Sequence, residues 1–126
     1  MKTDNDALPI ALAVLDHWRE AYATGEPQAM AALYAEDCLH YGGRPCVYVG
    51  TAGVLEYFAT LAARRHCAVR FDNVLARRLG PGAVHLACIA VFTVDDVTRP
   101  MRLTQTLTLE NGKWKVASHH ASPVPA

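Results

Sequence analysis

The spacing of apolar residues changes once along this chain, and that change limits the possible folds more than any other feature. Before Cys67, apolar side chains recur every three to four positions, which predicts α-helices. After it they alternate, and turn-forming residues separate the runs, which predicts β-strands. Helices followed by consecutive strands are typical of an α+β domain. The expected helices are Pro9–Thr24, Pro27–Ala35 and a third from Thr51 to Arg64-Arg65, and the expected strands are Cys38–Tyr41, Cys67–Ala76, Ala83–Val94, Met101–Leu109 and Trp114–His120.

The composition predicts one domain spanning residues 1–126, because 126 residues, 52% of them hydrophobic, suffice for a sizeable core. The 12 lysines and arginines balance the 12 acidic residues, so we expect neither nucleic acid nor a membrane as partner. The acidic N-terminus lacks the pattern of a signal peptide, and no apolar run is long enough to span a bilayer. The four cysteines show no CxxC spacing, which favours reduced thiols and a cytoplasmic protein.

The last two strands can be placed in register because Asn111-Gly112 predicts a two-residue type I′ turn. Counting outward from this turn gives the pairs Glu110 with Lys113, Leu109 with Trp114, Leu107 with Val116, Gln105 with Ser118 and Leu103 with His120. Alternate residues share one face of a sheet, so Gln105, Ser118 and His120 form a polar group on an otherwise apolar face. Buried polar groups need partners, so we expect this group to be bonded internally, hydrated or in contact with a ligand.

The expected strand Ala83–Val94 is apolar on both of its faces. One face carries Leu86, Cys88, Ala90 and Phe92, and the other carries Ala87, Ile89 and Val91. An antiparallel strand with one solvated face normally alternates apolar with polar residues. The expected helices are too few to cover both faces of the sheet, so we expect a second copy of the chain to cover one of them in a homodimer.

Several segments occur in an order and spacing that together are typical of one superfamily. Trp18–Glu26 is followed by Leu33–Cys38 with its YAED sequence, Val49–Val54 leads into a helix, and Gly112–Ser122 reads GKWKVASHHAS. These segments, together with Leu86–Val91, resemble the nuclear transport factor 2-like superfamily. Within it they are most similar to SnoaL-like proteins and to the association domain of calcium/calmodulin-dependent protein kinase II. The resemblance covers roughly residues 8 to 124.

The resemblance implies a cone-shaped α+β fold, also called cystatin-like, in which three N-terminal helices pack on a curved antiparallel sheet. Such a cone encloses a pocket, and the convex face of the sheet mediates dimers. Members include isomerases, dehydratases, cyclases, epoxide hydrolases and non-catalytic association modules, so the fold does not determine the function. The position that resembles the base of ketosteroid isomerases falls near Gly42, and the one that resembles their tyrosine donor falls at Trp18. We therefore expect that machinery to be absent.

Three residues are the candidate catalytic groups, namely His120, His40 and Tyr22. In a pocket, either imidazole could act as acid or base, and the tyrosine hydroxyl could contact a ligand. Each also has a structural interpretation, since His120 could fasten the last strand, His40 could end a strand and Tyr22 could belong to the core. The expected ligand-binding residues are Trp18, Tyr22, Phe58, Phe92, Gln105, Ser118 and His120.

No metal and no other cofactor is expected, because the histidines and cysteines show neither HExxH nor CxxC spacing. Two functions remain open. The first is a small SnoaL-like protein whose conical pocket takes a small apolar or carboxylate-bearing molecule, with weak acid–base chemistry of the isomerase, dehydratase or cyclase type. The alternative is a non-catalytic association module with a vestigial pocket. A cone collapsed around Trp18, Phe58 and Phe92 would favour the module.

Overall fold

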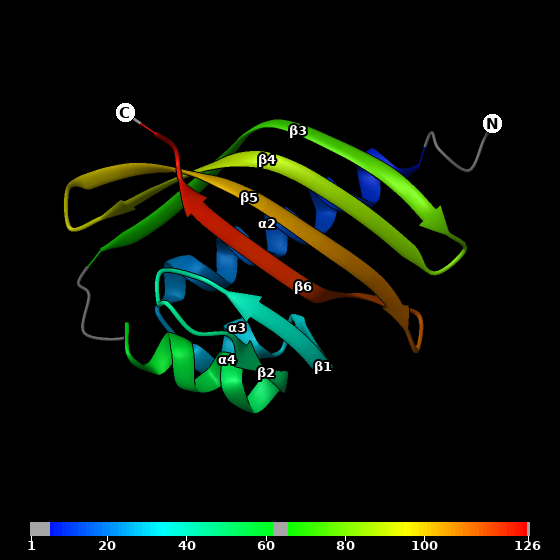
Figure 1. Ribbon diagram of the computed structural model, residues 1–126, viewed down its shortest axis with the longest axis horizontal. Helices are drawn as coiled ribbons and strands as arrows, with labels where there is room; N and C mark the ends of the chain where they lie inside the picture. The colour runs from blue at the N-terminus through cyan, green and yellow to red at the C-terminus, as the bar shows by residue number, and fades with distance from the viewer. Residues whose placement is uncertain (1–5, 62–65, 126) are drawn as a thin grey trace.

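The computed structural model describes residues 6–61 and 66–125. Figure 1 shows β3 to β6 as one long curved layer, with the long helix α2 packed behind it and α3 and α4 beside β1. This arrangement confirms the expected α+β fold, with helices preceding a curved sheet. The helices are α2 (Ala7–Thr24), α3 (Pro27–Ala31) and α4 (Gly50–Ala59), and the strands are β1 (Tyr34–Tyr41), β2 (Tyr48–Val49), β3 (Cys67–Gly80), β4 (Ala83–Val94), β5 (Val97–Glu110) and β6 (Lys113–Pro123).

The strands form one six-stranded sheet in the order β2-β1-β6-β5-β4-β3. The four long strands make an antiparallel meander, whereas β1 runs parallel to β6. The sheet is therefore mixed rather than wholly antiparallel as expected. Parallel neighbours need a long connection between them, and here all the elements from β2 to β5 lie between β1 and β6 in the chain.

Helix α2 buries one face against the concave side of the sheet. It ends at Gly25, whose left-handed φ of 72° carries little cost for glycine and whose N–H donates to the carbonyl of Tyr22 at 3.2 Å. This end agrees with the sequence prediction, while the helix begins at Ala7, slightly before the expected Pro9. The buried residues of α2 are Ala7, Ala11, Val14, Leu15, Trp18, Ala21 and Tyr22.

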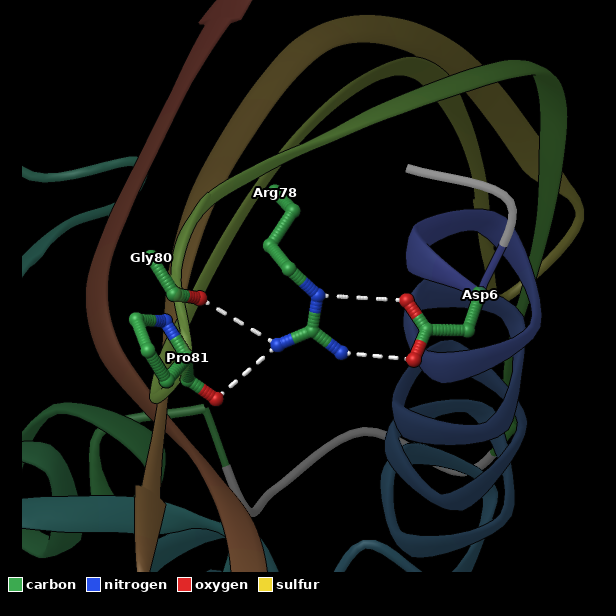
Figure 2. Close-up of polar contacts among 4 residues, drawn as sticks. All are labelled: Asp6, Arg78, Gly80 and Pro81. Carbon is green, nitrogen blue, oxygen red and sulfur yellow. Dashed lines mark hydrogen bonds and ion pairs between the residues drawn. The ribbon is translucent and has the colours of Figure 1, made fainter. Parts of the chain in front are cut away.

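Asp6 stands at the N-cap position of α2, but its carboxylate does not cap the helix. It accepts hydrogen bonds from Arg78 instead, at 2.7 Å from Nη2 and 3.1 Å from Nε, as Figure 2 shows. The other terminal nitrogen of Arg78 donates to the carbonyls of Gly80 at 3.2 Å and Pro81 at 2.9 Å. These bonds from Arg78, followed by its charge, lower the pKa of Asp6. One guanidinium thus ties the start of α2 to the turn between β3 and β4.

The short elements between α2 and α4 differ from their expected limits. Helix α3 ends at Ala31 rather than Ala35, and β1 already begins at Tyr34. The reason is a long-range contact, because the N–H of Val116 on β6 donates to the carbonyl of Leu33 at 2.9 Å. Helix α4 begins at Gly50, with no side-chain cap. It ends at Ala59, earlier than expected, and the predicted last residues Arg64-Arg65 lie outside the described ranges.

The hairpin between β5 and β6 starts in the expected register and then departs from it. Asn111 and Gly112 have φ values of 53° and 78°, as a type I′ turn requires. Pairing follows the prediction as far as Leu107 with Val116, but the next pair is Thr106 with Ser118. One extra residue, Ala117, is therefore inserted in β6 as a β-bulge.

The bulge changes which residues of β6 face the core. Gln105 pairs with His119 and Leu103 with Ala121, so the predicted pairs Gln105 with Ser118 and Leu103 with His120 are wrong. An insertion of one residue exchanges the two faces of a strand from that point onward. As a result His119 is buried, with 3% of its surface exposed, whereas His120 is exposed. The buried polar group of this hairpin is Gln105 with His119.

The two faces of β4 differ in how well the described residues cover them. The concave face buries Val84, Leu86, Cys88 and Ala90 beneath α2. The convex face carries Ala87 opposite Leu75 of β3, and 73% of the Leu75 surface is exposed. The expected homodimer through this face stays a prediction.

No helix in the described ranges combines the length and the apolar character needed to cross a bilayer.

Candidate functional site

A cavity of about 650 Å³ opens between the sheet and the helices. Its lining comes from α2, α4, the loop after β1, the ends of β4 and β5 near their shared turn, and the C-terminal end of β6. Two histidines, His40 and His119, and two arginines, Arg44 and Arg99, are its ionisable groups other than tyrosines, and none of the described aspartates or glutamates lines it. Its aromatic lining residues are Trp18, Tyr22, Tyr57, Phe58 and Phe92.

His119 is the centre of a stack of rings in the cavity wall. Its imidazole lies nearly parallel to the indole of Trp18, with ring centroids 5.7 Å apart and planes 10° apart. It also stacks on the imidazole of His40, at 4.4 Å and 20°. Tyr22 extends the stack on the side of Trp18, at 5.3 Å and 19°. Four rings from three separate elements thus form one wall.

Hydrogen bonds fix the inner edge of His119. The side-chain nitrogen of Gln105 lies 3.0 Å from Nδ1 of His119, and the hydroxyl of Tyr34 lies 3.4 Å from the same atom. The indole N–H of Trp18 donates to the Tyr34 hydroxyl at 3.1 Å. The four groups form a connected and buried polar chain behind the cavity wall.

His40 is buried without any hydrogen bond. It is 1% exposed, and within the described part of the chain neither Nδ1 nor Nε2 has a partner. Its ring contacts Tyr57 at 4.6 Å, Tyr34 at 5.4 Å and Phe58 at 5.6 Å between centroids. An unpartnered buried polar group costs about 1–3 kcal/mol. Leaving both ring nitrogens unpartnered therefore offsets part of the stability that the ring contacts of His40 provide.

Both imidazoles are uncharged at neutral pH. Burial lowers the pKa of His40 to about 4, because the surrounding rings solvate a cation poorly. Burial also holds the pKa of His119 well below its usual value, and the neighbouring imidazoles of His40 and His120 lower it further. A neutral imidazole offers one donor and one acceptor, so an imidazole that reaches the cavity can bind polar atoms without carrying charge.

The loop after β1 closes over His40. A Cβ at Gly42 would collide with the hydroxyl of Tyr57 and would lie 2.9 Å from Nε2 of His40. The N–H of Gly43 donates to that hydroxyl at 2.7 Å, which holds the loop against α4. No side chain fits at the position that resembles the isomerase base, because Tyr57 occupies the space.

The structure brings together five of the residues expected at the site. Trp18, Tyr22, His40, Phe58 and Phe92 all line the cavity. Gln105 lies directly behind it, bonded to His119. The remaining two, Ser118 and His120, lie outside it because of the bulge.

His120 points away from the cavity, toward the convex side of the sheet. Its ring lies 5.2 Å from that of Tyr41, and it borders a shallow hollow that also contains Asn73 and Arg102. Its neighbour His119 lines the cavity in its place, although the sequence did not single out His119 as a candidate. The pair His119-His120 does show that one imidazole must face inward, but choosing between them requires knowing where the strand is bulged.

Within residues 6–61 and 66–125, no group of three or more histidine, cysteine, aspartate or glutamate residues is arranged to hold a metal ion. The cysteines are all free, with Cys38 and Cys88 buried.

The fold and its cavity define a class of protein, the nuclear transport factor 2-like or cystatin-like α+β cones. Within that class, the sequence model of the SnoaL-like domain matches residues 11–126, and the chain belongs to this family. A search of curated proteins found no match.

Solved structures of similar fold come from several bacteria. A protein from Xanthomonas campestris, provisionally named a calcium/calmodulin-dependent protein kinase II association domain, is 26% identical with a TM-score of 0.84, over 91% of this chain and 86% of that one. An NTF2-like protein from Streptomyces avermitilis, provisionally named a dehydratase, is 20% identical with a TM-score of 0.83. The match covers 97% of this chain and 99% of that one. A protein from Novosphingobium aromaticivorans, provisionally named a scytalone dehydratase, is 11% identical with a TM-score of 0.85. The match covers 94% of this chain and 84% of that one.

Proposed function

We propose that this protein binds a small, largely apolar molecule that carries an oxygen function, and that it catalyses a cofactor-independent proton transfer on that molecule. The reaction would be of the isomerase, dehydratase or cyclase type. The observation that carries the proposal is the pair of buried, uncharged imidazoles, His40 and His119, in the wall of an aromatic cavity. Polar groups that a fold keeps at a cost to its stability are commonly functional.

The shape and lining of the cavity support a small-molecule ligand. Its volume of about 650 Å³ falls within the range that is usual for such sites. The faces and edges of Trp18, Tyr22 and Phe92 offer apolar contact to a flat ring system. The cone has not collapsed around its aromatic side chains, which favours a ligand over a vestigial pocket.

The chemistry follows from the low pKa of the imidazoles. A neutral imidazole can donate a hydrogen bond to an oxygen on which negative charge develops, and it can also accept a proton. A ligand enolate beside His119 would raise the pKa of that imidazole, because an opposite charge favours the protonated form. The site therefore supplies proton transfer most readily when the ligand itself becomes an anion.

We place this activity in the cytoplasm, since the free thiols suit a reducing compartment.

The test uses 2-tetralone, a bicyclic ketone whose α-hydrogens exchange with D₂O through the enolate. We expect the wild-type protein to accelerate this exchange above the buffer rate, as followed by proton NMR. His119→Gln should reduce the acceleration by about a hundredfold, the order expected for loss of an acid–base group. His40→Gln should reduce it less, because protein atoms enclose both nitrogens of His40 and the residue acts through its stack on His119. Arg70→Gln is the matched control, because Arg70 is exposed, pairs with Asp72 at 3.2 Å and does not line the cavity. Binding without any acceleration would contradict the catalytic part, and absence of binding would contradict the whole proposal.

An association module is the second candidate. The observations that favour it are the 26% identity to the Xanthomonas structure and the exposed apolar residues on the convex face, above all Leu75. We propose that a second copy of the chain covers this face. A homodimer that neither binds bicyclic probes nor exchanges 2-tetralone would favour the module and contradict the enzyme.

A further inference from the structure

The direction of the hydrogen bonds behind the cavity can be assigned from chemistry. The indole nitrogen of Trp18 can only donate, so it gives its hydrogen to the oxygen of Tyr34 at 3.1 Å. Burial raises the pKa of Tyr34, so its hydroxyl keeps a hydrogen of its own. In the described chain, the remaining acceptor for that hydrogen is Nδ1 of His119, at 3.4 Å. The Tyr34 hydroxyl therefore donates to the imidazole.

Gln105, on the neighbouring strand β5, also donates a hydrogen bond to Nδ1 of His119. Its amide nitrogen can only donate, and it lies 3.0 Å from Nδ1 of His119. In this orientation Oε1 of Gln105 is buried and has no partner in the described part of the chain. The reversed amide would give Oε1 a partner, but it would require a hydrogen on Nδ1 of His119, and both the Tyr34 hydroxyl hydrogen and the Gln105 amide nitrogen would then have no acceptor among the described residues. Two donors thus converge on one nitrogen, which must be unprotonated.

The single hydrogen of His119 must then lie on its other nitrogen. The imidazole is uncharged, because burial holds its pKa well below the usual value. Its Nε2 has no hydrogen-bond partner in the described ranges, yet it is not enclosed by protein atoms as both nitrogens of His40 are. Since His119 lines the cavity, this Nε2–H faces the space that a ligand would occupy.

We propose that Tyr34 and Gln105 hold His119 as its Nε2–H tautomer, and that the cavity therefore selects molecules that present an acceptor oxygen to this hydrogen. A ketone carbonyl, or the enolate formed from it, satisfies the requirement, whereas a group that offers only a hydrogen does not. This inference rests on the proposed function and deepens it by naming the ligand class. Tyr34 and Gln105 are positioning residues, since they act on the ligand through His119.

Three bicyclic probes of similar size separate the possibilities. 1-Indanone presents an acceptor oxygen, indole presents a donor N–H, and indane presents neither. We expect 1-indanone to bind about tenfold more tightly than indole or indane in calorimetric titrations, which is the effect of about one hydrogen bond. In nitrogen NMR spectra of protein labelled in histidine, Nε2 of His119 should be protonated and Nδ1 should not.

Variants test whether the two neighbours set the tautomer. Gln105→Leu and the double variant Tyr34→Phe with Gln105→Leu remove one or both donors to Nδ1. We expect the preference for 1-indanone over indole to fall in the first and to nearly disappear in the second, while the nitrogen spectra show a mixture of tautomers. Circular dichroism verifies folding, and the single variant supplies the answer if the double variant does not fold. Thr106→Val is the matched control, because Thr106 bonds His85 at 3.2 Å on the other face of β5.

Each outcome bears on a different statement. If 1-indanone, indole and indane all fail to bind, the proposed function fails. If they bind equally well, or if indole binds best, the proposed cavity stands and the inferred selectivity is overturned. A protonated Nδ1 on His119 in the wild-type spectra would also overturn it, as would an unchanged preference in Gln105→Leu and in the folded double variant.

Discussion

Gln105 donates a hydrogen bond to His119 across the last pair of strands, at 3.0 Å, where an unbroken ladder would have placed Ser118 opposite the glutamine. The single residue Ala117, inserted as a bulge, produces this pairing. It turns His119 into the cavity and His120 outward, so the chemistry of the site depends on one irregularity in one strand.

Acid should destabilise the protein through the buried histidines. An unfolded imidazole takes up a proton near its ordinary pKa of 6.5, whereas folded His40 does so only near 4. The unfolded state therefore binds more protons between these values, and stability falls as the pH is lowered through this range. We expect His40 to account for a loss of about 3 kcal/mol in unfolding free energy between pH 7 and pH 4, with His119 acting in the same direction.

Urea unfolding at a series of pH values measures this loss. His40→Gln should give a flatter pH dependence than the wild type, since glutamine does not titrate. His17→Gln is the control for replacing a histidine with glutamine, because His17 is exposed on α2 beside Glu20. Parallel curves for wild type and His40→Gln would contradict the prediction.

Gly42→Ala should destabilise the fold because the new methyl group would collide with Tyr57. We expect a loss of about 1–3 kcal/mol, as is usual for overpacking at a rigid site. The shorter side chain in Tyr57→Leu removes the obstacle, so the double variant should lose less than the sum of the two single losses.

Chemical unfolding of the wild type, Gly42→Ala, Tyr57→Leu and the double variant measures these losses in a double-mutant cycle. Gly82→Ala is the matched control, because its Cβ would meet no atom nearer than 3.9 Å. Additive losses in the cycle would mean that Tyr57 does not limit the space at position 42.

The second half of the fold follows from local chemistry, which is why it could be predicted. The turn at Asp95-Asp96 has φ values of 49° and 72°, and short polar side chains tolerate this region better than most. Strand β4 has the predicted limits, Ala83–Val94. The cone itself was expected from the resemblance of ordered motifs, and the family match agrees with it.

The site was only partly predictable, because distant contacts decide it. Tyr34 was assigned to a helix, but β6 draws its backbone into the sheet, where its hydroxyl reaches Trp18 and His119. The bulge at Ala117 has no local signature that distinguishes it from a regular strand. Counting by twos from the turn therefore gave the correct pairs up to Val116 and the wrong face beyond it.

The convex face should associate with a second copy of the chain. Leu75 is 73% exposed on β3 and lies opposite Ala87, so a dimer through this face would bury both. Leu75→Glu should convert a dimer into a monomer in sedimentation velocity, since a charge would be buried in the interface. Leu12→Glu on α2, where the leucine is 43% exposed, should leave the dimer intact. A wild-type monomer at micromolar concentration would contradict the prediction.

The rim of the cavity should favour anionic ligands. Arg44 and Arg99 line it, the guanidinium of Arg44 is 3.3 Å from the hydroxyl of Thr60, and none of the described aspartates or glutamates lines the cavity. We expect 2-naphthoate to bind more tightly than its neutral methyl ester, and Arg99→Gln to reduce this ratio about two- to fivefold, the effect of one partly exposed ion pair. Added salt should reduce the ratio as well, because exposed charges are screened.

Arg70→Gln, which removes a charge outside the cavity, is the control, and calorimetry with both ligands is the measurement. Equal reductions in Arg99→Gln and Arg70→Gln would assign the effect to net charge alone, and the rim would then have no specific role.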